Sequence, residues 1–344
     1  MKSRVSFLAL FLCVFTCTAF CFSETHVGKA TDDYFKDLFN SGGDRGNGVY
    51  SEVTSFGSNP GQLKMYKYVP ASAPTNAPLV LVLHGCTQTA QEIAARGGWN
   101  QLADRFGFYI LYPEQQKSNN QFVAFNWFQD EDIHHGQGEC ESIKQMIDRM
   151  KTDHSIDSKR IFVTGLSAGA CFTAVLCCEY PEIFAAGSVM SGIPYRAAGP
   201  NDAFMAMFQG KQHTPEEWAK LVKETNPDFT GSYPRMVIFH GTKDTTVNPI
   251  NLQELVKQFT AIHNINQTPT ITNTVKGFPH KLYQDEKGQT VVETYEITGM
   301  AHGIALDPGT GQDQGGSPGS FALAVGLYSS YYTLVSWGIA PNPS

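Results

Sequence analysis

Short runs of apolar residues recur along the chain and are separated by longer, more polar segments. The runs of strand length cover residues 78–85, 106–113, 160–165, 184–192, 235–241 and 290–299. Several of them are apolar almost throughout, as strands are when a parallel sheet buries them on both faces. The pattern therefore predicts a core of buried, mostly parallel strands.

Segments with helical periodicity lie between these runs. They cover residues 91–106, 141–153, 168–180, 249–263 and 321–338. In the second of them, Ile143, Met146, Ile147 and Met150 fall on one face of a helix. Alternation of strands and helices at this spacing predicts an α/β fold, a doubly wound and mostly parallel sheet with helices on both faces. Residues 196–234 break the alternation, and we expect them to form an insertion over one end of the sheet.

The first residues differ in character from the rest of the chain. Lys2 and Arg4 precede residues 5–22, which carry no charge, and polar residues follow. This order predicts a secretory signal over residues 1–23 and a single domain over residues 24–344. The alternative is a retained membrane anchor, because the uncharged stretch is close to the minimum length of a span. Lipid attachment at Cys17 or Cys21 is disfavoured, since Thr16 and Phe20 are not the small residues that precede a lipidated cysteine.

Composition limits the partners and the cellular location. Apolar residues make up 42% and charged residues 17% of the chain, which is typical of a globular protein. The formal charge is −7, and without the signal 23 basic and 32 acidic residues remain. We therefore expect no nucleic-acid partner and no stable membrane association after the signal is cleaved. The predicted location is extracellular or periplasmic.

Five cysteines remain outside the signal segment. They are Cys86, Cys140, Cys171, Cys177 and Cys178. Their spacing matches no zinc site, and we expect no metal and no cofactor. An odd number in an exported protein leaves at least one thiol free or paired with another chain.

The stretch TGLSAGACF, residues 164–172, joins a predicted strand directly to a predicted helix. Ser167 lies between Gly165 and Gly169, in the strand–turn–helix context of a nucleophile elbow. A turn this sharp strains the serine and crowds the residues two positions away, so glycine is needed there. The alternative is a glycine-rich turn without chemistry, since the chain holds 32 glycines. We interpret Ser167 as a nucleophile.

A serine nucleophile needs a base that is held by an acid. In this arrangement the acid follows a later strand, and the histidine follows the last one. Asp244 comes just after the run 235–241, and His302 comes just after the run 290–299. The rival acids are Asp307, which is close to His302 along the chain, and Glu293. We interpret His84 and His240, which end strands, as hydrogen-bonded structural residues.

The oxyanion of such a reaction needs two backbone N–H donors. The residue after the serine, Ala168, supplies one of them. The turn after the first apolar run, which begins at His84 and Gly85, supplies the other through Cys86 or Thr87. A plain glycine turn is the alternative interpretation of this dipeptide.

Several blocks of the sequence, taken together, resemble one family. The blocks are LVLHGCTQTA, GWNQLADRFGFYILYPEQ, FNWF, RIFVTGLSAGA, IFHGTKDTTV and GMAHGIALDPG. From about residue 55 to 335 the chain resembles the extracellular poly(3-hydroxybutyrate) depolymerase-like esterases, which are related to feruloyl and acetylxylan esterases. The resemblance implies the α/β-hydrolase fold, with Ser167, Asp244 and His302 as the catalytic triad. It also places Cys86 at the oxyanion position.

The chain departs from this family at two places. Many members carry a cysteine just before the FNWF block that could pair with the one in HGC, and this chain has none there. Cys86 and Cys140 are then the best candidates for a disulfide. The members of this family that attack solid polyester usually carry a binding domain after a linker, and we expect no such domain after residue 335 of this sequence.

These observations predict a secreted serine esterase that acts on short-chain acyl, hydroxyalkanoate, feruloyl or acetyl esters, small or oligomeric. The alternatives are an acyltransferase with the same triad and an inactive α/β-hydrolase that serves as a binding module. In the insertion over the active site, Phe204, Met205, Met207 and Phe208 lie close together. We expect them to form an apolar wall that favours small acyl or aryl groups. Trp127 and Phe128 either line the acyl pocket or belong to the core.

Overall fold

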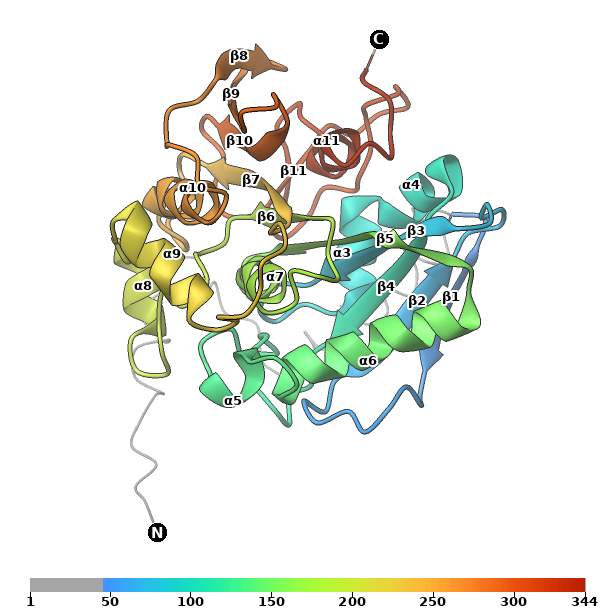
Figure 1. The fold of residues 1–344 in the computed structure, drawn as a ribbon. Coiled ribbons are helices and arrows are strands. Elements are labelled where there is room, and N and C mark those ends of the chain that lie inside the picture. Colours follow the sequence, from blue (N-terminus) through green and yellow to red (C-terminus); the bar gives the residue numbers. More distant parts are fainter. Residues whose placement is uncertain (1–45, 344) are drawn as a thin grey trace, which may run out of the picture. The chain divides into compact units, whose positions relative to one another are not determined.

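A ten-stranded sheet forms the centre of the structure, a computed structural model that describes residues 46–343 (Figure 1). The strand order is β1-β2-β4-β3-β5-β6-β7-β10-β9-β8. The strands are β1 (Val49–Val53), β2 (Lys64–Val69), β3 (Ala77–Leu83), β4 (Tyr109–Glu114), β5 (Ile156–Leu166), β6 (Ala186–Met190), β7 (Arg235–Gly241), β8 (Ile271–Val275), β9 (Phe278–Gln284) and β10 (Thr290–Ile297). From β4 to β10 the neighbours pair in parallel, while β1, β2, β8 and β9 pair antiparallel at the two ends. The predicted mostly parallel sheet is confirmed.

The central strands form where the apolar runs were predicted, because both of their faces are covered. Every residue of β3 is buried, and so is every residue of β6. The outer strands are different: four of the five residues of β8 are exposed. A strand with so little buried surface leaves no long apolar run in the sequence, and the sequence analysis did not find β1, β2, β8 or β9.

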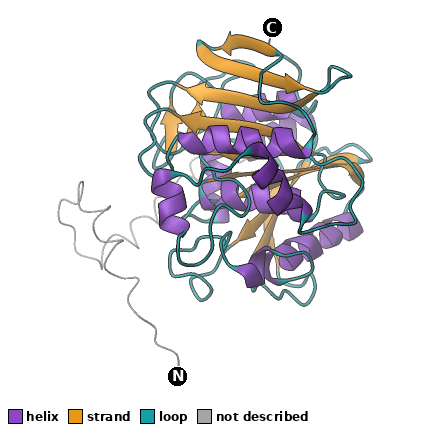
Figure 2. Cartoon of the chain, turned by 60° about the vertical axis from the view of Figure 1, so that its left-hand side comes forward, coloured by secondary structure: helices purple, strands orange, loops and turns teal. Residues whose placement is uncertain are grey.

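Helices cover both faces of the sheet, as Figure 2 shows. The first layer contains α6 (Gly138–Asp153), α7 (Ala168–Glu179), α9 (Pro215–Lys223) and α10 (Ile250–Ile262), which share one hydrophobic core. The second layer contains α3 (Ala90–Gly97), α4 (Trp99–Phe106) and α11 (Ser329–Ser336), which share another. The short helices α5 (Asp130–Ile133) and α8 (Ala203–Gln209) add Ile133, Ala203 and Ala206 to the first of these cores. The sheet is therefore doubly wound.

Two helix predictions need correction. The predicted helix 91–106 is two helices, because Gly98 between them has φ +66°, in the left-handed region. The predicted helix 321–338 is helical only over Ser329–Ser336. Its first part forms β12 (Ala322–Ala324), which pairs with β11 (Ile304–Leu306). Positive φ values of 57° at Phe321 and 84° at Gly326 prevent a helix there.

The direction of winding changes at β3. The chain leaves β3 for β4 on one side, and then returns to β5 on the other side of β3. In α/β proteins, ligands bind at the carboxyl ends of the strands next to such a change in direction. The loops after β3, β5, β7 and β10 carry Cys86, Ser167, Asp244 and His302. The predicted insertion 196–234 contains α8 and α9 and connects β6 to β7.

The predicted signal segment, residues 1–23, lies outside the described residues. Within residues 46–343, no helix combines the length and the apolar character that crossing a membrane requires.

Candidate active site

Ser167 occupies the turn between β5 and α7 in a conformation that side chains rarely adopt. Its φ is +56° and its ψ is −118°. Its N–H donates to Met190 O at 3.0 Å, and its carbonyl accepts from Cys171 N at 2.9 Å. A non-glycine residue at such an angle is strained, and surrounding structure must hold it there. Ser167 also precedes the first turn of α7, whose free N–H groups and dipole favour a nearby negative charge.

Two glycines make the turn possible for a steric reason. A Cβ atom on Gly165 would lie 2.3 Å from the carbonyl carbon of Gly169. A Cβ atom on Gly169 would lie 2.4 Å from Leu83 O, at the end of β3. Neither backbone can withdraw without opening the turn, so both positions of the motif need glycine.

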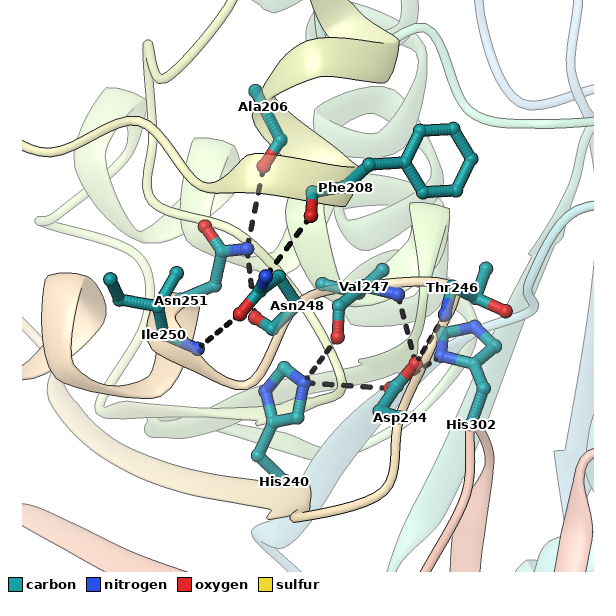
Figure 3. Close-up of polar contacts among 10 residues, drawn as sticks. All are labelled: Ala206, Phe208, His240, Asp244, Thr246, Val247, Asn248, Ile250, Asn251 and His302. Carbon is teal, nitrogen blue, oxygen red and sulfur yellow. Dashed lines mark hydrogen bonds and ion pairs between the residues drawn. The ribbon is translucent and has the colours of Figure 1, made fainter.

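His302 and Asp244 come together at the end of neighbouring strands (Figure 3). His302 Nδ1 lies 2.7 Å from Asp244 Oδ2. Because an ionised carboxylate only accepts, Nδ1 carries a proton, and in the neutral ring Nε2 is then the atom with the lone pair. The two loops are joined by backbone bonds, from Thr242 N to Ile297 O and from Lys243 N to Met300 O. Both side chains are therefore fixed relative to each other.

Asp244 is a buried carboxylate with several donors. Its Oδ1 accepts from Thr246 N at 2.9 Å and from Val247 N at 2.8 Å. Burial by itself raises the pKa of Asp244, but the contacts with His240 and His302 and the Val247 N–H outweigh burial and hold this pKa below its usual range. Asp244 is therefore ionised at neutral pH.

The two rival acids have other partners. Asp307 Oδ2 accepts from Gln314 Nε2 at 3.2 Å. Glu293 lies against His280 at 2.8 Å and accepts from Tyr295 at 2.7 Å. Neither of them pairs with His302 in the described part of the chain.

The loop after β3 provides one unoccupied donor close to Ser167. Between positions 85 and 88, the N–H groups of Gly85, Thr87 and Gln88 donate to Gln88 Oε1, Phe122 O and Gly85 O. Only the N–H of Cys86 has no acceptor among residues 46–343. A Cβ atom on Gly85 would lie 3.5 Å from Ser167 Cβ, so this loop packs against the serine. Of the two donors that the sequence left open, the structure favours Cys86 over Thr87.

His84 holds this loop from the buried side. Its Nε2 accepts from Gln115 N at 3.1 Å, so its Nδ1 must be the donor to Gly85 O, 2.8 Å away. Burial lowers the pKa of His84 to about 4, against the opposing effect of the bond to Gly85. The ring is therefore neutral at physiological pH. It fixes the plane of the peptide that carries the Cys86 N–H.

No hydrogen bond joins the Ser167 hydroxyl to His302 among the described residues. Such bonds are often long in the absence of substrate and tighten only in the complex. His240 was predicted to be a hydrogen-bonded residue, and its Nε2 does lie 2.9 Å from Val247 O. The contact of the same ring with Asp244, at 3.4 Å, was not predicted. Their spacing of four residues at the end of one strand is a signal that could have revealed it.

The aromatic and sulfur-containing side chains that were expected near the acyl group differ in their exposure. Trp127 is only 5% exposed and belongs to the core, whereas Phe128 is half-buried and stands edge-on to it at 5.2 Å. On α8, the rings of Phe204 and Phe208 stack at 6.4 Å, and Met205 is 53% exposed. The expected apolar side chains of the insertion are thus partly open to solvent.

The cysteine prediction is wrong. Cys86 and Cys140 form no disulfide, and all five thiols of the described chain are free. Cys140 belongs to the first turn of α6 and is completely buried. Cys171, Cys177 and Cys178 are buried in α7, and burial raises the pKa of each thiol.

Within residues 46–343, no group of three or more histidines, cysteines or acids is arranged to hold a metal ion.

Comparisons with known proteins agree on one family. The family model described as esterase PHB depolymerase matches residues 63–273. Poly(3-hydroxyalkanoate) depolymerase C of Paucimonas lemoignei is 49% identical over 84% of this chain and 70% of its own length. Feruloyl esterase B of Talaromyces funiculosus is 33% identical over 75% of this chain and 74% of its own. The structure of an acetyl xylan esterase from Aspergillus awamori superposes with a TM-score of 0.72 at 27% identity, over 85% of this chain and 100% of that one.

Proposed function

Since the chain belongs to the esterase PHB depolymerase family and is a carboxylic ester hydrolase, we propose that it cleaves esters of short hydroxyalkanoic acids through an acyl-enzyme on Ser167. One observation carries the assignment of the site. His302 and Asp244 meet at 2.7 Å, in loops that leave the same edge of the sheet as the strained Ser167. This fixes the tautomer in which His302 Nε2 can accept a proton.

In the first half of the reaction, Ser167 Oγ attacks the carbonyl carbon of the ester. His302 Nε2 accepts the hydroxyl proton, and Asp244 stabilises the imidazolium that forms. The carbonyl oxygen becomes an anion, and the N–H groups of Cys86 and Ala168 donate to it. When the tetrahedral intermediate collapses, the imidazolium returns the proton to the departing alkoxide. The alcohol leaves, and the acyl group remains on Ser167.

In the second half, water takes the place of the alcohol. His302 Nε2 accepts a proton from the water as it attacks the acyl carbon, and the same two N–H groups stabilise the new oxyanion. Collapse of this intermediate releases the carboxylic acid and restores the Ser167 hydroxyl. No metal or cofactor enters either step.

Two observations support hydroxyalkanoate esters as the substrate class. The chain is more similar to the poly(3-hydroxyalkanoate) depolymerase relative than to the feruloyl esterase relative, at 49% against 33% identity. The apolar side chains of α8, with Met205 exposed, suit a small aliphatic acyl group. Their half-exposed surface also leaves room for a chain that continues beyond the scissile ester.

The test compares four esters with the intact protein: a soluble 3-hydroxybutyrate trimer, p-nitrophenyl butyrate, methyl ferulate and acetylated xylan. We expect turnover of the first two and at least tenfold slower turnover of methyl ferulate and acetylated xylan. The control is Ser167→Ala, which should melt near the wild-type temperature and lower kcat by a factor of about 10⁶. A fluorophosphonate should label Ser167 in the wild type. Labelling at another residue, or turnover by the Ala variant, would contradict the site, and faster hydrolysis of methyl ferulate would contradict the substrate class.

A further inference from the structure

A second histidine contacts the acid of the proposed triad. His240 lies near the end of β7 and is 1% exposed. Its Nε2 lies 2.9 Å from Val247 O and 3.4 Å from Asp244 Oδ2 (Figure 3). A carbonyl and a carboxylate both accept only, so Nε2 carries the ring proton and shares it between them.

The other nitrogen of His240 fixes the state of the ring. His240 Nδ1 is buried and has no hydrogen-bond partner among the described residues. A proton on this atom would place an unpaired donor on a charged ring inside the core, which is costly. The ring is therefore neutral and keeps a single tautomer, with its donor aimed at the acid loop.

Charged and titratable groups also lie on the elements next to His240. Asp244 lies in the loop that follows β7, the strand of His240. His302 contacts the same carboxylate from the loop after β10. Glu296 is the register partner of His240 on β10. On α10, which packs against β7, Glu254 pairs with Lys257 at 2.6 Å. Of these groups, Asp244 is the one in contact with the donor of His240.

His240 acts on both oxygens of the carboxylate. It contacts Oδ2 directly, beside His302. It also holds the carbonyl of Val247, and the N–H of the same residue donates to Oδ1. The carboxylate cannot rotate about its Cβ–Cγ bond without breaking this turn, so Oδ2 stays directed at His302.

From this geometry, and on the basis of the triad proposed above, we propose that His240 is a positioning residue for ester hydrolysis. It orients the Asp244 carboxylate and takes part of its charge through a second hydrogen bond. Without this donor, Asp244 is held less firmly, and kcat falls. Of the two histidines, only His302 then interacts with the negative charge on Oδ2, and this favours the imidazolium form of His302. The acid limb of the pH profile of kcat/KM therefore moves to higher pH.

The experiment compares His240→Leu with His240→Gln in the intact protein. Leu removes the donor, whereas the amide nitrogen of Gln reaches about the position of the histidine Nε2. For Leu, we expect kcat/KM to fall by about 10-fold or more, as for loss of a hydrogen bond to a charged group. We also expect its acid limb to rise by about half a pH unit, a measurable change in the interaction of the two charges. Gln should keep the wild-type profile and most of the activity.

His263→Leu is the matched control. His263 Nε2 contacts a backbone carbonyl, Pro234 O, at 3.2 Å, but it lies at the far end of α10. This variant should lower the melting temperature without moving the pH profile. If His240→Leu does not fold, His240→Asn replaces it, because its shorter amide stops near the position of Nδ1 and leaves Asp244 without the donor. Asn should then show the shifted acid limb, and Gln should not.

Parallel measurements on Asp244→Asn separate the two proposals. If Asp244→Asn keeps its turnover, the triad is wrong and the role of His240 falls with it. If Asp244→Asn is inactive, but Leu or Asn at position 240 has the acid limb of the wild type, only the proposal for His240 is overturned. A folded Gln variant with the shifted profile of Leu would overturn it as well.

Discussion

Asp244 accepts hydrogen bonds at both oxygens while it lies almost entirely out of contact with solvent. Two backbone N–H groups reach Oδ1, and two imidazoles reach Oδ2. Burial of an ionised carboxylate is unfavourable unless donors replace the lost water. Here the hydrogen-bond donors outweigh the effect of burial, so Asp244 stays ionised, and its charge faces His302. At the scale of single residues, the proposed triad depends on this orientation of the Asp244 charge.

We expect Asp244→Asn to lower kcat by about 10⁴-fold. The amide nitrogen of Asn would face His302 Nδ1 as a donor, which favours the tautomer with its proton on Nε2. That atom could then no longer accept the proton of Ser167. Initial rates with p-nitrophenyl butyrate measure the loss, and the melting curve shows whether the variant is folded. A loss of less than tenfold in a folded variant would contradict the role of Asp244.

The same substitution should change the pH dependence of stability. The pKa of Asp244 is lower in the folded protein than its ordinary value of about 4, so its charge stabilises the folded state above that pH. This contribution is lost as the pH falls toward the folded pKa. Urea unfolding at pH 7 should give Asp244→Asn a free energy of unfolding about 2 kcal/mol below the wild type, and this gap should narrow below about pH 4. Asp130→Asn is the control, since Asp130 is 78% exposed. If the difference in the free energy of unfolding does not change with pH, Asp244 is not an ionised, hydrogen-bonded carboxylate in the folded protein.

The sequence points to the residues of the proposed site more directly than to their contacts. Ser167, Asp244 and His302 could be proposed as the triad because each follows a strand whose apolar run is easy to identify. Without the family resemblance, the choice between Cys86 and Thr87 stays open, because it depends on Phe122, a residue far along the chain whose carbonyl accepts from the Thr87 N–H. The contact of His240 with Asp244 also depends on how the acid loop folds back over the end of β7.

At the scale of elements, α8 is fastened to the loop that carries the acid. Asn248 N donates to Met207 O at 2.8 Å, and Asn248 Nδ2 donates to Phe208 O at 3.0 Å. The Oδ1 atom of Asn248 accepts from Ile250 N at the start of α10. The Asn248 side chain thus donates to a carbonyl near the end of α8 and accepts from the first N–H of α10 (Figure 3). The apolar residues of α8 are held at a fixed place relative to Asp244.

We expect Asn248→Ala to raise KM several-fold for p-nitrophenyl esters with little change in kcat. The substitution removes the side-chain tie of α8, which we expect to bind the acyl group, but no part of the triad. Loss of binding that is equal in the ground state and the transition state appears in KM alone. Asn266→Ala is the control, because the Asn266 side chain accepts from the nearby Thr268 N in an exposed loop. A large fall in kcat with unchanged KM would show that α8 has no part in substrate binding.

The strands that are buried on both faces were predicted from the sequence, whereas the exposed ones were not. Runs such as β3 and β6 are buried on both faces, so composition alone identifies them. The strand β8 carries four β-branched residues and pairs with β9, but it is mostly exposed and so contains no apolar run. The segment 321–338 has the composition of a helix, but its first part pairs with β11 instead. In the second case, tertiary pairing decided against local preference.

At the scale of the whole molecule, the surface is poor in apolar side chains. Among residues 46–343, the clearly exposed large hydrophobic side chains are Val49, Met205 and Ile271. They lie on β1, α8 and β8, which belong to different parts of the fold. The chain also has a formal charge of −7. Adsorption to a solid polyester needs a broad apolar face, which three separated side chains do not provide.

We therefore expect the protein to hydrolyse a soluble 3-hydroxybutyrate trimer much faster than a suspension of crystalline poly(3-hydroxybutyrate). A single ester of the solid must leave its neighbours to reach Ser167, and the described surface offers little to hold the particle while it does so. Release of 3-hydroxybutyrate is measured from both substrates at equal concentrations of ester bonds and of enzyme. Fusion of a polyester-binding module should raise the rate on the solid by about 10²-fold or more through local concentration, and leave the rate on the trimer unchanged. Equal rates on both substrates without the fusion would mean that the exposed part of α8 around Met205 suffices to dock a polymer surface. Met205→Ser would then have to abolish hydrolysis of the solid while it spares hydrolysis of the trimer.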